Sequence, residues 1–130
     1  MTEKEIKNLL PIFEVHPEVK LVYLFGSQAT GKTGPLSDYD FAVYIDEKNS
    51  LQRFDIRLEL FADLSSALKT DNIDLSVLND VDVPELKYNI IKDGILIFER
   101  EPFKVLIEPE ILMEYFDFHA LLLRYNLTKG

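Results

Sequence analysis

The sequence predicts an α/β (α+β) fold in a single domain, because short apolar runs typical of strands alternate with stretches of helical periodicity. The 130 residues are enough for one hydrophobic core and too few for two domains. Apolar residues make up 47% of the chain, which supports a globular fold. We therefore expect residues 1–130 to form one domain, with a core over 1–100 and a C-terminal helical tail over 105–130.

Three apolar runs predict strands, and a shorter one predicts a fourth. The run over 19–25 is apolar almost throughout, which is typical of a central strand covered on both faces. The runs over 38–46 and 73–78 instead alternate, so that successive side chains point to opposite faces of the sheet. The fourth, short strand is expected over 95–98.

Helical periodicity marks the first half of the chain in two places. Thr2 and Glu5 form a capping-box pattern that begins a first helix, which Pro11 should kink or split. His16, just after it, is expected to be a solvated helix-end residue. A long second helix over 51–68 has apolar residues at spacings of three and four, and we expect all of them in the core: Leu51, Phe54, Leu58, Phe61, Leu64 and Leu68. Arg53 and Arg57, four apart on it, are expected to be surface residues paired with nearby acids.

Two further helices are predicted in the second half. The first begins near Pro84 and ends at Gly94, and the charged loop over 99–104 is a plausible hinge. Pro109 is expected to begin the last helix, whose apolar residues reach more than halfway round it. Such a helix needs cover on two sides, one from this domain and one from a second chain. The residues expected to face that chain are Tyr115, Phe116, Phe118 and Leu122.

The head of the second strand carries two carboxylates. Asp38 and Asp40 are two residues apart, so both point to one face, with Tyr39 and Phe41 turned toward the core. Aspartate is depleted within strands, so two on one face indicate a special role. Aligned carboxylates suit Mg²⁺, a hard cation that takes oxygen ligands and often binds together with substrate phosphates.

A loop rich in glycine precedes these carboxylates. Gly26 allows a phosphate to approach the backbone closely, and Ser27 offers a hydroxyl and an N–H at a helical turn that we expect over 26–31. The segment 26–33 also matches the phosphate-binding P-loop pattern, which requires a helix at Lys32 and the threonine after it. Gly34 and Pro35 follow at once and block that helix, so the match is interpreted as accidental.

Gly26-Ser27, ten intervening residues and Asp38-Tyr39-Asp40 form a GSx10DxD signature. With it, the chain resembles the nucleotidyltransferase fold of the DNA polymerase β superfamily, a small mixed β-sheet flanked by helices. Its size is similar to that of the minimal nucleotidyltransferase branch, the MntA-type antitoxins that pair with HEPN toxins. Many relatives have a basic residue after the Gly-Ser pair, where this chain has Gln28.

The resemblance implies an activity, its cofactors and a partner. Asp74 on the third strand would complete a triad with Asp38 and Asp40, holding two Mg²⁺ ions, while Gly26 and Ser27 would hold the phosphates of ATP. The implied reaction transfers AMP from ATP to a tyrosine hydroxyl of a HEPN-type RNase toxin. The alternatives are a non-catalytic antitoxin that acts by binding alone, and a transferase acting on a small molecule such as an aminoglycoside.

Composition limits the remaining possibilities. The net charge of −9 argues against direct nucleic-acid binding, which depends on Lys and Arg, and is compatible with a basic protein partner. The absence of cysteine excludes thiolate metal sites and fits a cytoplasmic protein, and no apolar run is long enough to cross a membrane. The sequence leaves open the acceptor, the donor preference, the number of nucleotides transferred, the oligomeric state, and whether Lys32, Arg53 or Arg57 contacts the triphosphate.

Overall fold

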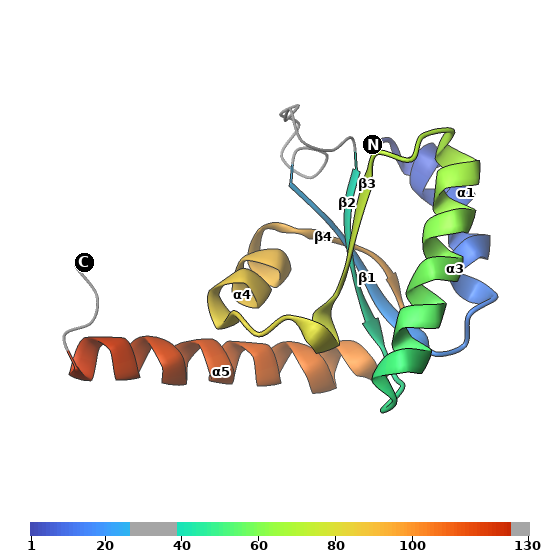
Figure 1. The fold of residues 1–130 in the computed structure, drawn as a ribbon. Helices are drawn as coiled ribbons and strands as arrows, with labels where there is room; N and C mark the ends of the chain where they lie inside the picture. The colour runs from blue at the N-terminus through green and yellow to red at the C-terminus, as the bar shows by residue number, and fades with distance from the viewer. Residues whose placement is uncertain (27–38, 126–130) are drawn as a thin grey trace.

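The computed structural model describes residues 1–26 and 39–125, which form a four-stranded mixed sheet between two pairs of helices (Figure 1). The strands run in the order β3-β2-β1-β4 across the sheet. The elements are α1 (Glu3–Glu14), β1 (Val19–Phe25), β2 (Tyr39–Ile45), α3 (Ser50–Leu68), β3 (Ile73–Val77), the 3-10 helix η1 (Leu78–Asp80), α4 (Pro84–Asp93), β4 (Ile95–Glu99) and α5 (Phe103–Arg124). No described helix meets the length and hydropathy needed to cross a bilayer.

The connections explain the strand directions. β1 is antiparallel to both of its neighbours, and β2 and β3 are parallel because α3 carries the chain back across the sheet between them. In this parallel pair Asp40 is aligned with Asp74, and Phe41 with Leu75. The mixed sheet flanked by helices confirms the predicted α/β fold.

Each face of the sheet has its own core. α1 and α3 cover one face and α4 and α5 the other, as Figure 1 shows. The first core contains Phe41, Val43 and Leu75, and the second contains Tyr23 and Ala42. The alternation predicted for β2 and β3 is thereby confirmed, and Asp40 and Asp74 belong by alternation to the face of α4 and α5.

Pro11 was predicted to kink or split the first helix, and a split is wrong because α1 continues as a helix to Glu14. The capping box at Thr2 and Glu5 is present as expected. Proline inside a helix costs about 3 kcal/mol. Leu9 and Phe13, on either side of Pro11, are fully buried, and each such burial stabilises by about 1.5–3 kcal/mol. The burial of these two side chains offsets the lost hydrogen bond.

The core prediction for α3 is wrong for its N-terminal half. Leu51, Phe54 and Leu58 are 75%, 52% and 46% exposed. Leu64 is buried as expected, together with Leu60, which the predicted series omitted. A helix turns by about 100° per residue, so the predicted series drifts from the solvent face at its start to the core at its end.

The last helix begins earlier than predicted. α5 starts at Phe103, and Pro109 lies inside it. Phe103 contacts the ring of Tyr44 at 6.1 Å between centroids and, with Ile107, packs on the second core. The carbonyl that the Pro109 ring leaves without its helical donor is that of Val105, whose side chain is 70% exposed, so water can reach this turn.

The segment before α5, which the sequence predicted as a hinge, is hydrogen-bonded to β1 and to the end of α1. The guanidinium of Arg100 donates to the carbonyls of Val19, Phe13 and Glu14 at 3.0, 3.3 and 3.0 Å. Its backbone N–H donates to the carbonyl of Lys20 at 2.8 Å. Arg100 thus ties the end of β4 to β1 and to the C-terminal end of α1.

Candidate functional site

Two carboxylates meet at one end of the sheet. Asp40 lies near the start of β2 and Asp74 near the start of β3, directly opposite each other in the parallel register. Neighbouring strands are about 4.8 Å apart, and aligned residues point to the same face. Asp40 is half-buried and Asp74 is exposed. Their side chains therefore line one surface, with one carboxylate set deeper than the other.

The backbone at Gly26 lies against the deeper carboxylate. Gly26 has φ +70°, in the left-handed region that glycine adopts without strain. A Cβ added there would lie 2.4 Å from Oδ2 of Asp40. Because Phe25 is paired with Asp40 across the β1–β2 ladder, the chain leaves β1 immediately beside this side chain. The site thus requires glycine at this position, for its conformation and for the space it leaves.

The other predicted site residues lie outside the described part of the chain. Ser27, Lys32 and Asp38 all belong to the segment 27–38. The helical turn expected over 26–31 lies in the same segment, apart from Gly26. Among residues 1–26 and 39–125, no group of three or more His, Asp or Glu side chains is arranged to hold a metal. The predicted triad needs Asp38 in addition to the described pair, so the triad stays a prediction.

The described pair has the chemistry that a hard cation needs. Asp40 and Asp74 present oxygen donors in register on one face, next to the backbone at Gly26. Mg²⁺ is typically bound through one or two carboxylates together with substrate phosphates, so two protein carboxylates fit it.

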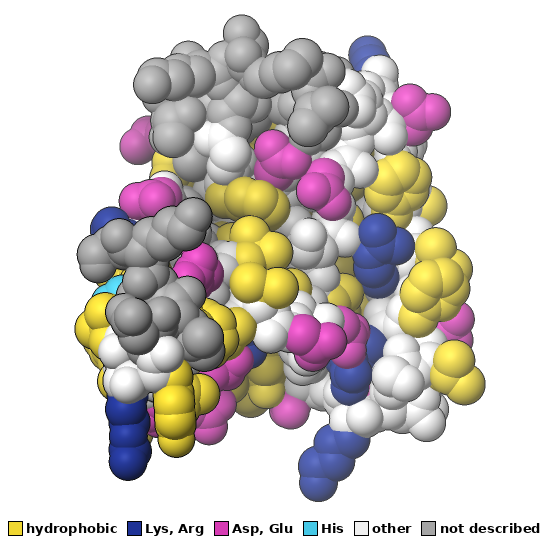
Figure 2. Space-filling model, turned by 60° about the vertical axis from the view of Figure 1, so that its left-hand side comes forward, with side chains coloured by type: hydrophobic (Ala, Val, Ile, Leu, Met, Phe, Trp, Pro, Cys, Tyr) yellow, Lys and Arg dark blue, Asp and Glu magenta, His cyan; other side chains and the backbone are white. Residues whose placement is uncertain are grey.

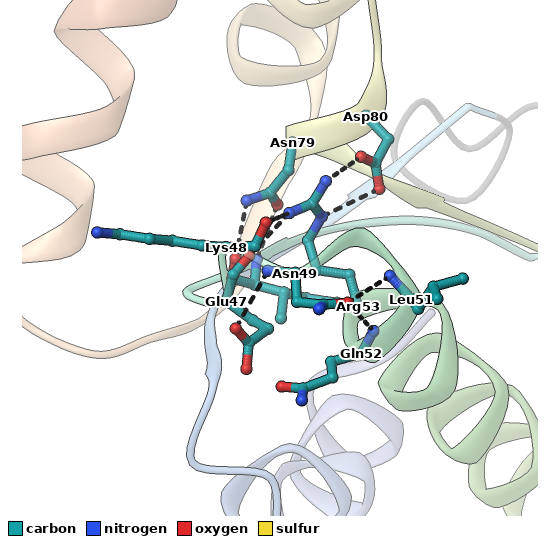
Figure 3. Close-up of polar contacts among 9 residues, drawn as sticks. Glu47, Lys48, Asn49, Leu51, Gln52, Arg53, Asn79 and Asp80 are labelled. Carbon is teal, nitrogen blue, oxygen red and sulfur yellow. Dashed lines mark hydrogen bonds and ion pairs between the residues drawn. The ribbon is translucent and has the colours of Figure 1, made fainter.

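Arg53 is committed to a structural network at the opposite end of β2 (Figure 3). Its Nη2 lies 2.6 Å from Oδ1 of Asp80, and its Nη1 donates to the carbonyls of Glu47 and Lys48. The hydrogen bond to Asp80 raises the pKa of Arg53 above its ordinary value. The predicted surface ion pair is therefore present. Asp40 lies five residues before the end of β2, about 17 Å along the strand, which places Arg53 far from the carboxylates.

The polar contacts around Arg53 also close the end of the sheet. Asn79 accepts from the N–H of Ile45 at 3.0 Å and donates to its carbonyl at 2.8 Å, as a neighbouring strand would (Figure 3). This role of Asn79 was not predictable from the sequence, because a lone asparagine after a strand is typical of any turn. Arg57 donates to the carbonyl of Leu75 at 2.7 Å from the side of α3, the face opposite Asp40 and Asp74.

His16 is not the solvated residue that its position predicted. Its side chain is only 12% exposed and lies 3.6 Å from Glu59 and 3.4 Å from Asp63, both on α3. His119 is exposed and stacks on Tyr115 of the same helix with ring centroids 5.8 Å apart. Both histidines therefore lie outside β2 and β3.

A buried polar contact that the sequence did not predict links β1 to α5. The hydroxyl of Tyr23, a residue that is 1% exposed, donates to Oε2 of Glu108. Burial, followed by this hydrogen bond, raises the pKa of Tyr23 well above its ordinary value of 10. A tyrosine in an apolar strand reads as ordinary core, so its acceptor becomes visible only once α5 is placed.

Comparison with known proteins agrees with this geometry. The sequence model of the family described as "Polymerase beta, Nucleotidyltransferase" matches residues 7–103. No curated protein matches the chain.

Solved structures share the fold over most of the chain. A crystal structure of a toxin–antitoxin with AMP-PNP superposes with a TM-score of 0.72 at 23% identity, covering 92% of this chain and 94% of that one. A mutant of the toxin–antitoxin MntA-HpeT with two aspartates replaced by glutamate gives 0.72 at 21% identity, with the same coverage. A second MntA-HpeT mutant gives 0.67 at 21% identity, covering 92% of both chains.

Proposed function

The chain belongs to the polymerase β nucleotidyltransferase family, and we propose that it is an antitoxin that transfers AMP from ATP to a tyrosine hydroxyl of a HEPN-type RNase toxin. The observation that carries the catalytic part is the alignment of Asp40 with Asp74 on one face, with the backbone of Gly26 against Asp40. This arrangement leaves a carboxylate-lined surface beside a glycine turn, where a triphosphate with its metal can be accommodated.

In this proposal the residues divide the work of a phosphoryl transfer. Asp38, Asp40 and Asp74 would hold two Mg²⁺ ions, which would supply positive charge against the triphosphate. Gly26 and Ser27 would hold the β- and γ-phosphates through their backbone N–H groups and the serine hydroxyl.

The acceptor oxygen attacks the α-phosphorus, and the bond from that phosphorus to the oxygen bridging to the β-phosphate breaks. Pyrophosphate leaves, and Asp74 would accept the proton of the attacking hydroxyl. Asp74 suits this role because it is the exposed member of the pair and can be reached by a bulky acceptor. The remaining contribution of the chain is to position the groups before the reaction.

The toxin partner is supported by the solved structures with this fold. Those structures are of toxin–antitoxins, one of them with the nucleotide AMP-PNP. In one of them the two aspartates changed to glutamate are two residues apart, the same spacing as Asp38 and Asp40 here. The acidic surface of this chain suits a basic partner, since its net charge is −9.

Labelled ATP tests the proposal. The purified chain, Mg²⁺ and a candidate HEPN-type toxin are incubated together, and label on the toxin is measured with and without EDTA. We expect labelling that requires the metal and is lost in Asp40→Asn. Asp82→Asn, an exposed carboxylate between η1 and α4, is the matched control and should keep full labelling.

The same experiment separates the alternatives. Neutralisation of the toxin without labelling, and without any effect of Asp40→Asn, would show an antitoxin that acts by binding alone. Labelling of an aminoglycoside in place of the protein would show a small-molecule transferase. Either result contradicts the proposed acceptor.

A further inference from the structure

The outward face of α5 carries a continuous apolar row. Going along the helix, the spacing between its members alternates between three and four residues. We call this row the outer seam, and its members are Leu106, Pro109, Met113, Phe116, Ala120 and Leu123. All six are exposed, and Met113 is 67% exposed. The seam covers about 26 Å of helix at 1.5 Å per residue.

The domain itself uses a different face of this helix. Ile111 is buried, and Tyr115 stacks on Tyr88 of α4 with ring centroids 3.9 Å apart and planes 7° from parallel. Phe118, expected in the interface, is half-buried, whereas Phe116 is 57% exposed. Of the predicted interface residues, Phe116 is therefore the outward anchor and Tyr115 belongs to the domain.

The spacing of the seam specifies what can cover it. Rows at alternating three- and four-residue intervals are the knobs that fit between the side chains of another helix. Figure 1 shows that α5 extends beyond α4, and Figure 2 shows hydrophobic side chains at the end of α5 that comes forward. In the described part of the chain α4 reaches only the edge of the seam, where the ring of Tyr88 lies 6.2 Å from that of Phe116, and all six seam residues stay exposed. An apolar surface of this length usually marks an interaction site.

Charge on the flanks of the seam selects among partners. Glu110 and Asp117 lie seven residues apart on one flank, both exposed, and Arg124 follows only at the end of the helix. The other flank begins with Val105 and Leu112, which widen the apolar surface. A helix bearing Lys or Arg beside its own apolar row would place cations against the two carboxylates.

A second copy of the chain is a poorer occupant. An antiparallel pair of α5 helices centred between Met113 and Phe116 would place Glu110 of one copy within about 3 Å, along the helix axis, of Asp117 of the other and on the same flank. Like charges at such positions disfavour a pairing. Each copy would also bring a net charge of −9 to the complex.

We propose that the outer seam of α5 docks an amphipathic helix of a partner protein whose apolar row is flanked by Lys and Arg. The inference deepens the proposed function by giving the chemistry of the partner's surface. Only the identification of that partner as a toxin rests on the proposed function.

Two synthetic 21-residue helical peptides test the seam. Both carry leucine at alternating three- and four-residue spacing, and they differ only in having lysine or glutamate on the flanks. Binding to the full chain is measured by fluorescence anisotropy without ATP or Mg²⁺, at low and high salt. We expect the lysine peptide to bind at least tenfold more tightly than the glutamate peptide, with the difference shrinking as salt rises.

Variants locate the binding. Phe116→Asp should weaken binding of the lysine peptide at least tenfold. Glu110→Lys combined with Asp117→Lys should make the chain bind the glutamate peptide more tightly than the lysine peptide. Leu58→Asp, at a residue on α3 of comparable exposure, is the matched control and should change nothing. Phe116→Asp also removes ring contacts with Tyr88 and Tyr115, so circular dichroism and urea unfolding are measured for every variant, and affinities are compared at concentrations where each variant is folded.

Three results would overturn the inference. These are equal affinity for the two peptides, binding that survives Phe116→Asp, and sedimentation of the chain alone as a dimer that Phe116→Asp dissociates. The last would identify a second copy as the occupant. Because the measurement contains no nucleotide, failure here leaves AMP transfer untouched, and loss of transfer in Asp40→Asn leaves peptide binding untouched.

Discussion

Replacing Gly26 by alanine should separate folding stability from transfer. Gly26 has φ +70°, and a Cβ there would lie 2.4 Å from Oδ2 and 3.1 Å from Cγ of Asp40. The left-handed conformation costs an alanine about 1–2 kcal/mol. The Asp40 carboxylate must also rotate away, and an off-rotamer side chain costs about 0.5–1.5 kcal/mol. Gly26→Ala should therefore reduce the free energy of unfolding by roughly 2–3 kcal/mol.

The same rotation should impair the reaction more than the fold. A misplacement of about 1 Å at a reacting centre can cost 10²-fold in rate. We therefore expect labelling of the acceptor to fall about 100-fold in a protein that still unfolds cooperatively in urea. Gly94→Ala is the control. Its Cβ would lie 2.3 Å from the carbonyl oxygen of Ile90, so it should reduce stability while folded molecules keep their activity.

A double-mutant cycle isolates the contact with Asp40. In an Asp40→Ala background the clash is absent, so Gly26→Ala should cost only the conformational part, about 1–2 kcal/mol. The two backgrounds should then differ by about 0.5–1.5 kcal/mol, measured by urea unfolding. An equal cost in both backgrounds, or normal transfer in Gly26→Ala, would refute the close approach on which the site is built.

Three further predictions concern other contacts. Tyr23→Phe removes the donor to Oε2 of Glu108 and should reduce the free energy of unfolding by about 1–3 kcal/mol near neutral pH. The folded state raises the pKa of Tyr23 above 10, so urea unfolding above that pH should show a larger loss of stability in the parent chain than in the variant. Arg100→Gln should lower the midpoint of thermal unfolding by roughly 5–10 °C, and a change within 1 °C would contradict its clamping role. Ser27→Ala should reduce labelling more than Lys32→Ala, whereas a loss confined to the lysine variant would favour a P-loop.

Much of the sheet could be predicted because alternation reports faces directly. Phe41 and Leu75 go to one core and Asp40 and Asp74 to the other face, as the period of two requires. Their alignment across β2 and β3 was implied by the resemblance and not by local pattern, because register depends on the whole crossover. The resemblance to the nucleotidyltransferase family is confirmed by the family match.

The helices were less predictable, because an apolar residue can serve either of two faces. α5 buries Ile111 and exposes Met113 two residues later. The sequence predicted apolar residues on two sides of this helix but did not say which side the domain itself would cover. Pro109 looked like a helix start, since a proline is favoured in a first turn. Phe103 overrides that preference, because its burial against Tyr44 extends the helix backward. Such decisions lie in tertiary contacts that periodicity does not contain.

The pairing of β1 with β4 has a consequence for the order in which the chain can fold during synthesis. Leu21 is aligned with Glu99, so one edge of a buried strand has no hydrogen-bonding partner until the ribosome has released residue 99. Arg100, which holds the end of α1, follows immediately. A nascent chain therefore carries an open, apolar strand edge of the kind that recruits other chains or chaperones. Closing it requires a loop of most of the domain, so completion of the sheet should be a late and comparatively slow step.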